Sequence, residues 1–240
     1  MNAKEAFERY MKNYDLNDFD INLKYEHTFR VATRAKELAE TLNLSSEDIE
    51  LAYLCGFLHD IGRFEQIKVH HTYIDTENMD HGDYGVLVLF EKGLIKHFTD
   101  KKENYSVIEK CVYNHNKHAI ESNLNEKELF FCQIVRDADK LDIFDLIIND
   151  AFPYECNGKV TKEIHDDIII GKCVKYPNMK TATDNFVAWL SYIYDINFDW
   201  SFEYLNKNKI VNKLEEKTKN TTTEQYVKQI KKYIKERLKC

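Results

Sequence analysis

The sequence predicts an all-α fold. Only 7 Gly and 2 Pro occur among its 240 residues, and a shortage of both helix breakers favours long helices over a turn-rich β fold. Apolar residues recur at three- and four-residue steps in several segments, which is the period of an amphipathic helix. Because 43% of the residues are hydrophobic, these helices have enough apolar surface to form a core.

The first helices can be placed from these apolar steps. Residues 25–42 carry Val31, Ala35 and Leu38 on one face, and residues 47–59 carry a second apolar face. Gly62 is expected to terminate that second helix, so that residues 63–80 form a loop. Three further helices are expected, from about residue 82, over residues 105–115 and over residues 126–148, the last with Leu129 facing inward.

The last third of the chain has a looser pattern. Pro153 and Gly158 indicate a loop, and Ile168-Ile169-Ile170 is compatible with a helix or a strand. A helix is expected over residues 184–194, an exposed Lys-, Asn- and Thr-rich stretch over 207–223, and a basic surface helix over 224–238. With no repeat or linker, we expect a helical domain over residues 1–150 and a mostly helical extension over 151–240, packed on the same core.

Composition excludes several classes of protein. The net charge is -7, which argues against a broad nucleic-acid surface but leaves room for a small anionic substrate. The chain lacks CxxC pairs and a signal-peptide apolar region, and no apolar run reaches membrane-spanning length. We therefore expect a cytoplasmic protein, with Cys55, Cys111 and Cys132 as core residues. The sequence is silent on oligomeric state.

Ionisable side chains recur on the apolar faces of the expected helices. His59 and Asp60 are adjacent, and His59 lies four residues after Cys55. His27, His115 and Asp139 also stand four residues from an apolar position, and His81 stands beside Gly82 at a helix start. Buried polar groups are costly unless they are paired or bind something. One shared metal centre between packed helices would account for several such groups at once.

Imidazole and carboxylate ligands suit a divalent transition metal, with Fe, Mn, Zn, Co and Ni as candidates and Mg as a further one. The six candidates are too many for one metal that keeps open positions. They suit two metals per chain, with Asp60 as the bridge between them. A mononuclear site made by four of them is the alternative, and those four are His27, His59, Asp60 and Asp139.

The motifs that carry these residues resemble the HD-domain metal-dependent phosphohydrolase superfamily. They are Tyr25-Glu26-His27, Leu58-His59-Asp60-Ile61-Gly62-Arg63 and Arg136-Asp137-Ala138-Asp139-Lys140-Leu141. The resemblance covers residues 25–148 and implies His27, His59, Asp60 and Asp139 as core ligands. His81 and His115 match the binuclear branches. The Gly-Tyr-Pro signature of the cyclic-di-GMP phosphodiesterase branch is missing after the His-Asp pair, so that substrate is not expected.

The resemblance implies hydrolysis of a phosphoester or phosphoanhydride bond. The expected partner is a small phosphorylated substrate such as a nucleotide, attacked by a metal-activated water. Asp60 and Arg63 are the candidate catalytic residues, with Arg63 either holding a substrate phosphate or forming a surface ion pair. Two alternatives stay open, a mixed-valent di-iron oxygenase with the same ligand order and a non-catalytic binding module.

Overall fold

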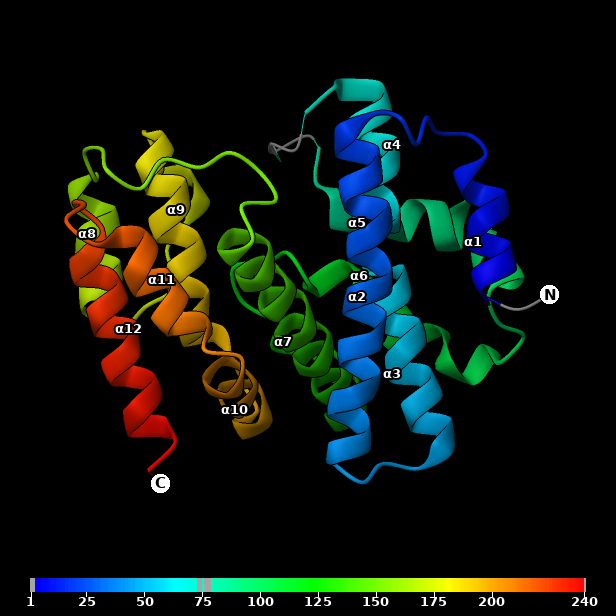
Figure 1. The fold of residues 1–240 in the computed structure, drawn as a ribbon. Helices are drawn as coiled ribbons and strands as arrows, with labels where there is room; N and C mark the ends of the chain where they lie inside the picture. Colours follow the sequence, from blue (N-terminus) through cyan, green and yellow to red (C-terminus); the bar gives the residue numbers. More distant parts are fainter. Residues whose placement is uncertain (1–2, 73–74, 76–78, 240) are drawn as a thin grey trace. The chain divides into compact units, whose positions relative to one another are not determined.

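The computed structural model describes residues 3–72, 75 and 79–239. Their regular structure consists of helices, with no β-strand among the residues described (Figure 1), so the all-α prediction is confirmed. The chain forms two compact units, Met1–Ala138 and Asp139–Cys240. The predicted division into domains near residue 150 stays a prediction, because compact units do not establish which segments fold independently.

The first unit is built around two long neighbouring helices, α2 and α3. Asp18 caps α2 by accepting hydrogen bonds from the backbone of Asp20 and Ile21, and Ser45 caps α3 through Asp48. The Asp18 cap explains why α2 starts six residues before its predicted start. The α-helices of this unit are α1 (Ala3–Met11), α2 (Phe19–Thr41), α3 (Ser46–Leu58), α4 (Ile61–His70), α5 (His81–Val86), α6 (Tyr105–Asn114) and the first part of α7 (Glu126–Ile148).

Shorter helical turns connect α5 to α6. A π-helical turn, Leu87–Glu91, follows α5 directly, and two 3₁₀ turns cover Leu94–His97 and Lys102–Asn104. The three cysteines expected in the core, Cys55, Cys111 and Cys132, are buried. Leu129 contradicts its prediction, because its side chain is 39% exposed on α7.

The prediction that Gly62 ends a helix and that a loop follows is wrong for residues 61–70. The interruption lies at Asp60 (φ -102°, ψ 15°), and Gly62 is the second residue of α4. A Cβ atom at Gly62 would lie 2.3 Å from the carbonyl oxygen of His81 and 2.4 Å from the backbone nitrogen of Gly85. Gly62 therefore permits close packing of α4 on α5. The later part of the predicted loop falls partly outside the described residues, at 73–74 and 76–78.

The second unit has its own apolar core. Phe186, Leu190, Phe202 and Ile230 are among its fully buried side chains. The isoleucine run falls at the end of a helix, which settles the choice left open by the sequence. The helices are α8 (Lys162–Ile169), a 3₁₀ turn (Tyr176–Asn178), α9 (Ala182–Ser191), a 3₁₀ turn (Tyr192–Asp195), α10 (Asp199–Lys207), α11 (Ile210–Thr218) and α12 (Glu224–Arg237).

Residues 207–223 were expected to be exposed, and for α11 that expectation is wrong. Ile210, Leu214 and Thr218 recur at four-residue steps and are buried, so the helix packs one face into the core despite its polar composition. None of the helices within the described residues combines the length and the apolar character needed to cross a membrane.

Candidate metal centre

The His-Asp pair lies at the junction between α3 and α4. His59 caps the end of α3, and Asp60 precedes the first residue of α4. His59 is 0% and Asp60 2% exposed. Burial at this level is unusual for a carboxylate and needs a compensating charge or a bound ion.

Each oxygen of the Asp60 carboxylate faces a different pair of histidines. Oδ2 lies 3.6 Å from the Nε2 atoms of both His27 and His59. Oδ1 lies 3.4 Å from the Nε2 atoms of both His81 and His115. Within the pairs, the two Nε2 atoms are 3.2 Å apart for His27 and His59, and 2.9 Å apart for His81 and His115. Asp60 therefore stands between two clusters of donor atoms.

Hydrogen bonds behind the rings determine which ring nitrogen carries the proton in three of the histidines. Nδ1 of His59 lies 2.6 Å from the carbonyl oxygen of Gly56, and Nδ1 of His115 lies 2.7 Å from that of Val112. Nδ1 of His81 lies 2.7 Å from Oδ2 of Asp75. Carbonyl and carboxylate oxygens only accept hydrogen bonds, so each Nδ1 donates and each Nε2 keeps its lone pair.

These lone pairs and the buried carboxylate fit a metal ion. Oδ1 of Asp60 is buried and makes no hydrogen bond to any residue that the structure describes, which is costly for a polar atom. It faces the Nε2 atoms of His81 and His115, whose lone pairs are the donors that a metal ion accepts. His59, Asp60 and His115 offer ligand atoms within 4.8 Å of one another. The donor set suits Fe, Mn, Zn, Co or Ni.

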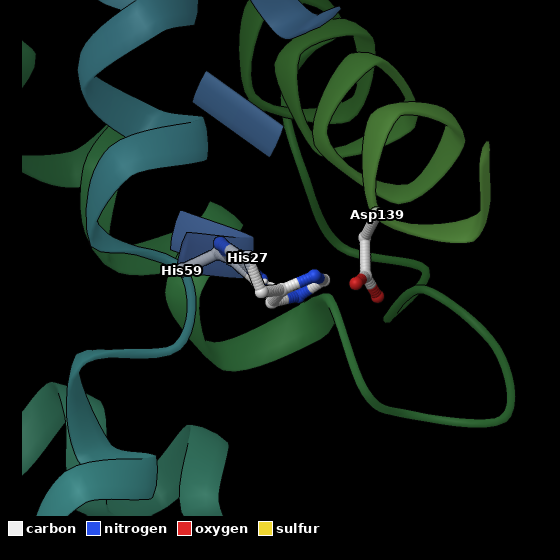
Figure 2. Close-up of side chains that lie close together, drawn as sticks. All are labelled: His27, His59 and Asp139. Atoms are coloured by element: carbon white, nitrogen blue, oxygen red, sulfur yellow. Dashed lines mark hydrogen bonds between the residues drawn. The ribbon is translucent and has the colours of Figure 1, made fainter. Parts of the chain in front are cut away.

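The second group of donor atoms includes Asp139. Figure 2 shows its carboxylate on helix α7, with the rings of His27 and His59 directed toward it. These three side chains also offer ligand atoms within 4.8 Å of one another. Asp139 lies within α7, which continues without a break from residues of the first unit. The position of Asp139 is therefore fixed by the helical turn that precedes it.

Two cationic side chains contact the centre. Lys24 donates from Nζ to Oδ2 of Asp60 over 2.6 Å. Arg63 donates from Nη2 to Nε2 of His81 over 2.9 Å, and its Nη1 lies 3.4 Å from Oδ1 of Asp75. With only 9% exposure, Arg63 is a buried neighbour of the histidines. The surface ion pair weighed for it from the sequence is therefore wrong.

The surroundings favour the protonation states that metal ligands need. Burial raises the pKa of Asp60, but its neighbours, first among them the ammonium group of Lys24, together lower that pKa more strongly, so it lies well below its usual value. Burial and the Arg63 guanidinium lower the pKa of His81 to about 4, against the raising effect of Asp75. At neutral pH the carboxylate is therefore ionised and the His81 ring is neutral.

Sequence reasoning missed Lys24 and Asp75. A signal for Lys24 was present, because it precedes His27 by three residues and helical geometry places both on one face. Asp75 gave no such signal. It follows α4 in a polar segment without periodicity, and only the fold brings it against His81.

Comparison with known proteins identifies one match. Residues 25–143 match the model of the HD domain. This segment contains all six candidate ligands, from His27 to Asp139. No curated protein and no solved structure shows significant similarity to the chain.

Proposed function

Because the chain belongs to the HD-domain family, whose members are mostly metal-dependent hydrolases, we propose that it is a metal-dependent phosphohydrolase. It cleaves a phosphoester or phosphoanhydride bond of a small phosphorylated molecule such as a nucleotide. The observation that carries the proposal is the position of Asp60, with one oxygen facing each histidine pair.

The proposed ligands fall into two sets joined by Asp60. His27, His59 and Asp139 would hold one ion together with Asp60, and His81 and His115 would hold the other together with Asp60. When bound, such ions lower the pKa of a coordinated water and neutralise charge on phosphoryl oxygens. The backbone carbonyls of Gly56 and Val112, and the carboxylate of Asp75, keep three of the rings oriented with Nε2 toward the centre.

The charges around the centre support an anionic substrate. Among the residues of the first unit described here, the carboxylates of Asp60 and Asp75 are matched by the cations Lys24 and Arg63. Two divalent ions would therefore leave the centre positive even after Asp139 is included. Phosphoryl groups are the common small ligands with enough negative charge to balance such a site.

Arg63 is the proposed phosphate-binding side chain. Its guanidinium lies beside His81 and is held by Gln66 and by Asp75, 3.4 Å away. A planar fork fixed in this way can donate two parallel hydrogen bonds to a phosphoryl group. Replacing Arg63 with Lys keeps the charge but removes the fork, so KM for a phosphoester should rise more than kcat falls.

The direct test is a phosphoester panel with protein reconstituted with Mn²⁺, Fe²⁺, Co²⁺ or Mg²⁺ after chelator-free purification. We expect release of phosphate or nucleoside from at least one nucleotide, sugar phosphate or aryl phosphate, and its loss in Asp60→Asn. Asp166→Asn is the matched control, since Asp166 is an exposed residue of the second unit paired with Lys162. If the fully metal-loaded protein releases neither phosphate nor nucleoside from any compound of the panel, the proposed hydrolysis is refuted.

The same preparation separates the two alternatives left by the sequence. Activity with Mn²⁺ or Mg²⁺ under anaerobic conditions excludes an oxygenase. Oxygen uptake together with a mixed-valent iron signal in electron paramagnetic resonance would replace hydrolysis with oxidation. Ligand binding without turnover, retained when metal ligands are substituted by alanine, would identify a binding module.

A further inference from the structure

We propose that Lys24 is a displaceable counter-cation of the metal centre. Its ammonium group holds Oδ2 of Asp60 as long as no metal lies beside His27 and His59. A metal that binds there displaces the ammonium group, which then contacts the anionic substrate. The first half concerns metal binding alone, and the second half rests on the proposed function.

The two oxygens of Asp60 are not equivalent. Oδ2 accepts a hydrogen bond from Nζ of Lys24 over 2.6 Å, whereas Oδ1 makes no hydrogen bond to the described residues. Oδ2 is also the oxygen that faces His27 and His59. A metal that uses this pair and Oδ2 must therefore compete with a positive charge already in contact with one of its ligand atoms.

The Lys24 side chain can leave without a change in the backbone. It is 19% exposed, against 2% for the Asp60 carboxylate that it contacts. A lysine ammonium group sits on a flexible four-carbon stem, and Lys24 lies within the second turn of α2, where the helix is continuous. The head group can therefore move outward while His27, one turn further along, keeps its position.

Arg63, the other cation of the centre, is more firmly held. Its guanidinium contacts Gln66, Asp75 and His81, and the residue is 9% exposed. A metal at Nε2 of His81 would replace the hydrogen bond from Arg63 to that atom, but the contacts to Gln66 and Asp75 would still hold the guanidinium in place. The two cations therefore differ in role, and Lys24 is the one that can exchange between a carboxylate and a substrate.

After displacement, the ammonium group stays on a side chain anchored next to the centre. Like-charge repulsion from the metal makes a position close to that ion unfavourable unless an anion lies between them. A phosphoryl oxygen of the substrate would supply such an anion. The proposal thus links metal binding to phosphate affinity through one side chain.

The test of the first half is metal binding, measured by titration calorimetry with Mn²⁺ on metal-free full-length protein. Lys24→Met removes the charge and keeps a side chain of similar length. We expect one of the two binding steps to tighten by about tenfold or more. Lys36→Met is the matched control, since Lys36 is an exposed residue of the same helix that pairs with Glu40 at 3.7 Å.

Lys24→Arg keeps the positive charge and should bind Mn²⁺ as the original protein does. If Lys24→Met folds poorly, Lys24→Gln serves as a second neutral variant. Its affinity for Mn²⁺ is then compared with that of Lys24→Arg. Unchanged or weaker Mn²⁺ binding in both neutral variants, with folded protein shown by circular dichroism, would overturn the proposal.

The second half is tested with inorganic phosphate and the Mn²⁺-loaded protein. Lys24→Met should weaken phosphate binding by about tenfold, and Lys36→Met should leave it unchanged. Tighter Mn²⁺ binding with unaltered phosphate binding would refute the contact between Lys24 and the substrate. It would still support competition between Lys24 and a metal for Asp60. Failure of the phosphoester panel would refute hydrolysis without altering the outcome of the metal titration.

Discussion

Replacing Gly62 with alanine should disturb the junction that places Asp60 next to His81. The new Cβ atom would lie 2.3 Å from the carbonyl oxygen of His81, and 2.4 Å and 2.9 Å from backbone atoms of Gly85. All three are backbone atoms, so no side-chain end can move aside. Overpacking of this kind costs about 3 kcal/mol, and the better helix propensity of alanine returns about 1 kcal/mol.

The net loss of about 2 kcal/mol should lower the unfolding midpoint by about 4–8 °C for a chain of this size. Far-UV circular dichroism of the metal-free protein measures it. Gly93→Ala is the control, because no atom lies within 4 Å of its Cβ position and only its positive φ of 74° is unfavourable, at a cost of about 1 kcal/mol. If Gly62→Ala melts at the midpoint of the original protein, or above Gly93→Ala, the packing argument is wrong.

Three further predictions concern the side chains behind the centre and the second unit. Asp75→Ala removes the acceptor for Nδ1 of His81 and should weaken metal binding at the His81–His115 pair by about 10–100-fold in a metal titration; unchanged affinity would contradict this. His81 has a pKa of about 4 when folded and 6.5 as a model value, so below about pH 6.5 the unfolded chain binds a proton that the folded metal-free protein does not. Its stability should therefore fall by up to about 3 kcal/mol as the pH drops from about 6.5 to 4, and urea unfolding with no slope over this window would refute the shift. Asp184→Ala should destabilise the second unit by about 3 kcal/mol or more in urea unfolding, because the buried carboxylate accepts four hydrogen bonds from residues 161, 180 and 181; a loss below about 1 kcal/mol would count against it.

The sequence predicted much of the candidate centre because helical periodicity determines the direction of each side chain. His27 lies four residues before buried Val31, and His115 four after buried Cys111, and both histidines are buried as expected. Helix α7 was placed at its observed bounds for the same reason. His81 had no apolar face to support it, and its role was indicated by its position beside Gly82 at a helix start and by its match to the family motif.

The missing parts depend on contacts between distant segments. A glycine can end a helix or let two helices approach closely, and the sequence near Gly62 is compatible with both. The structure shows the second role, because the backbone of Gly85 lies where a Cβ atom at Gly62 would be. Lys24 contacts Asp60 across 36 positions of sequence. Asp75 contacts His81 over only six positions, but in a stretch without the helical periodicity that would place the two side chains together. No local pattern records such contacts.

Metal content measures the central claim most directly. Elemental analysis of protein purified without chelator or affinity metal should find about two metal ions per chain, and Asp60→Ala should lose one or both. That result follows from a carboxylate whose two oxygens face separate histidine pairs. Full metal content in Asp60→Ala, or protein without metal before the substitution, would contradict the bridging role.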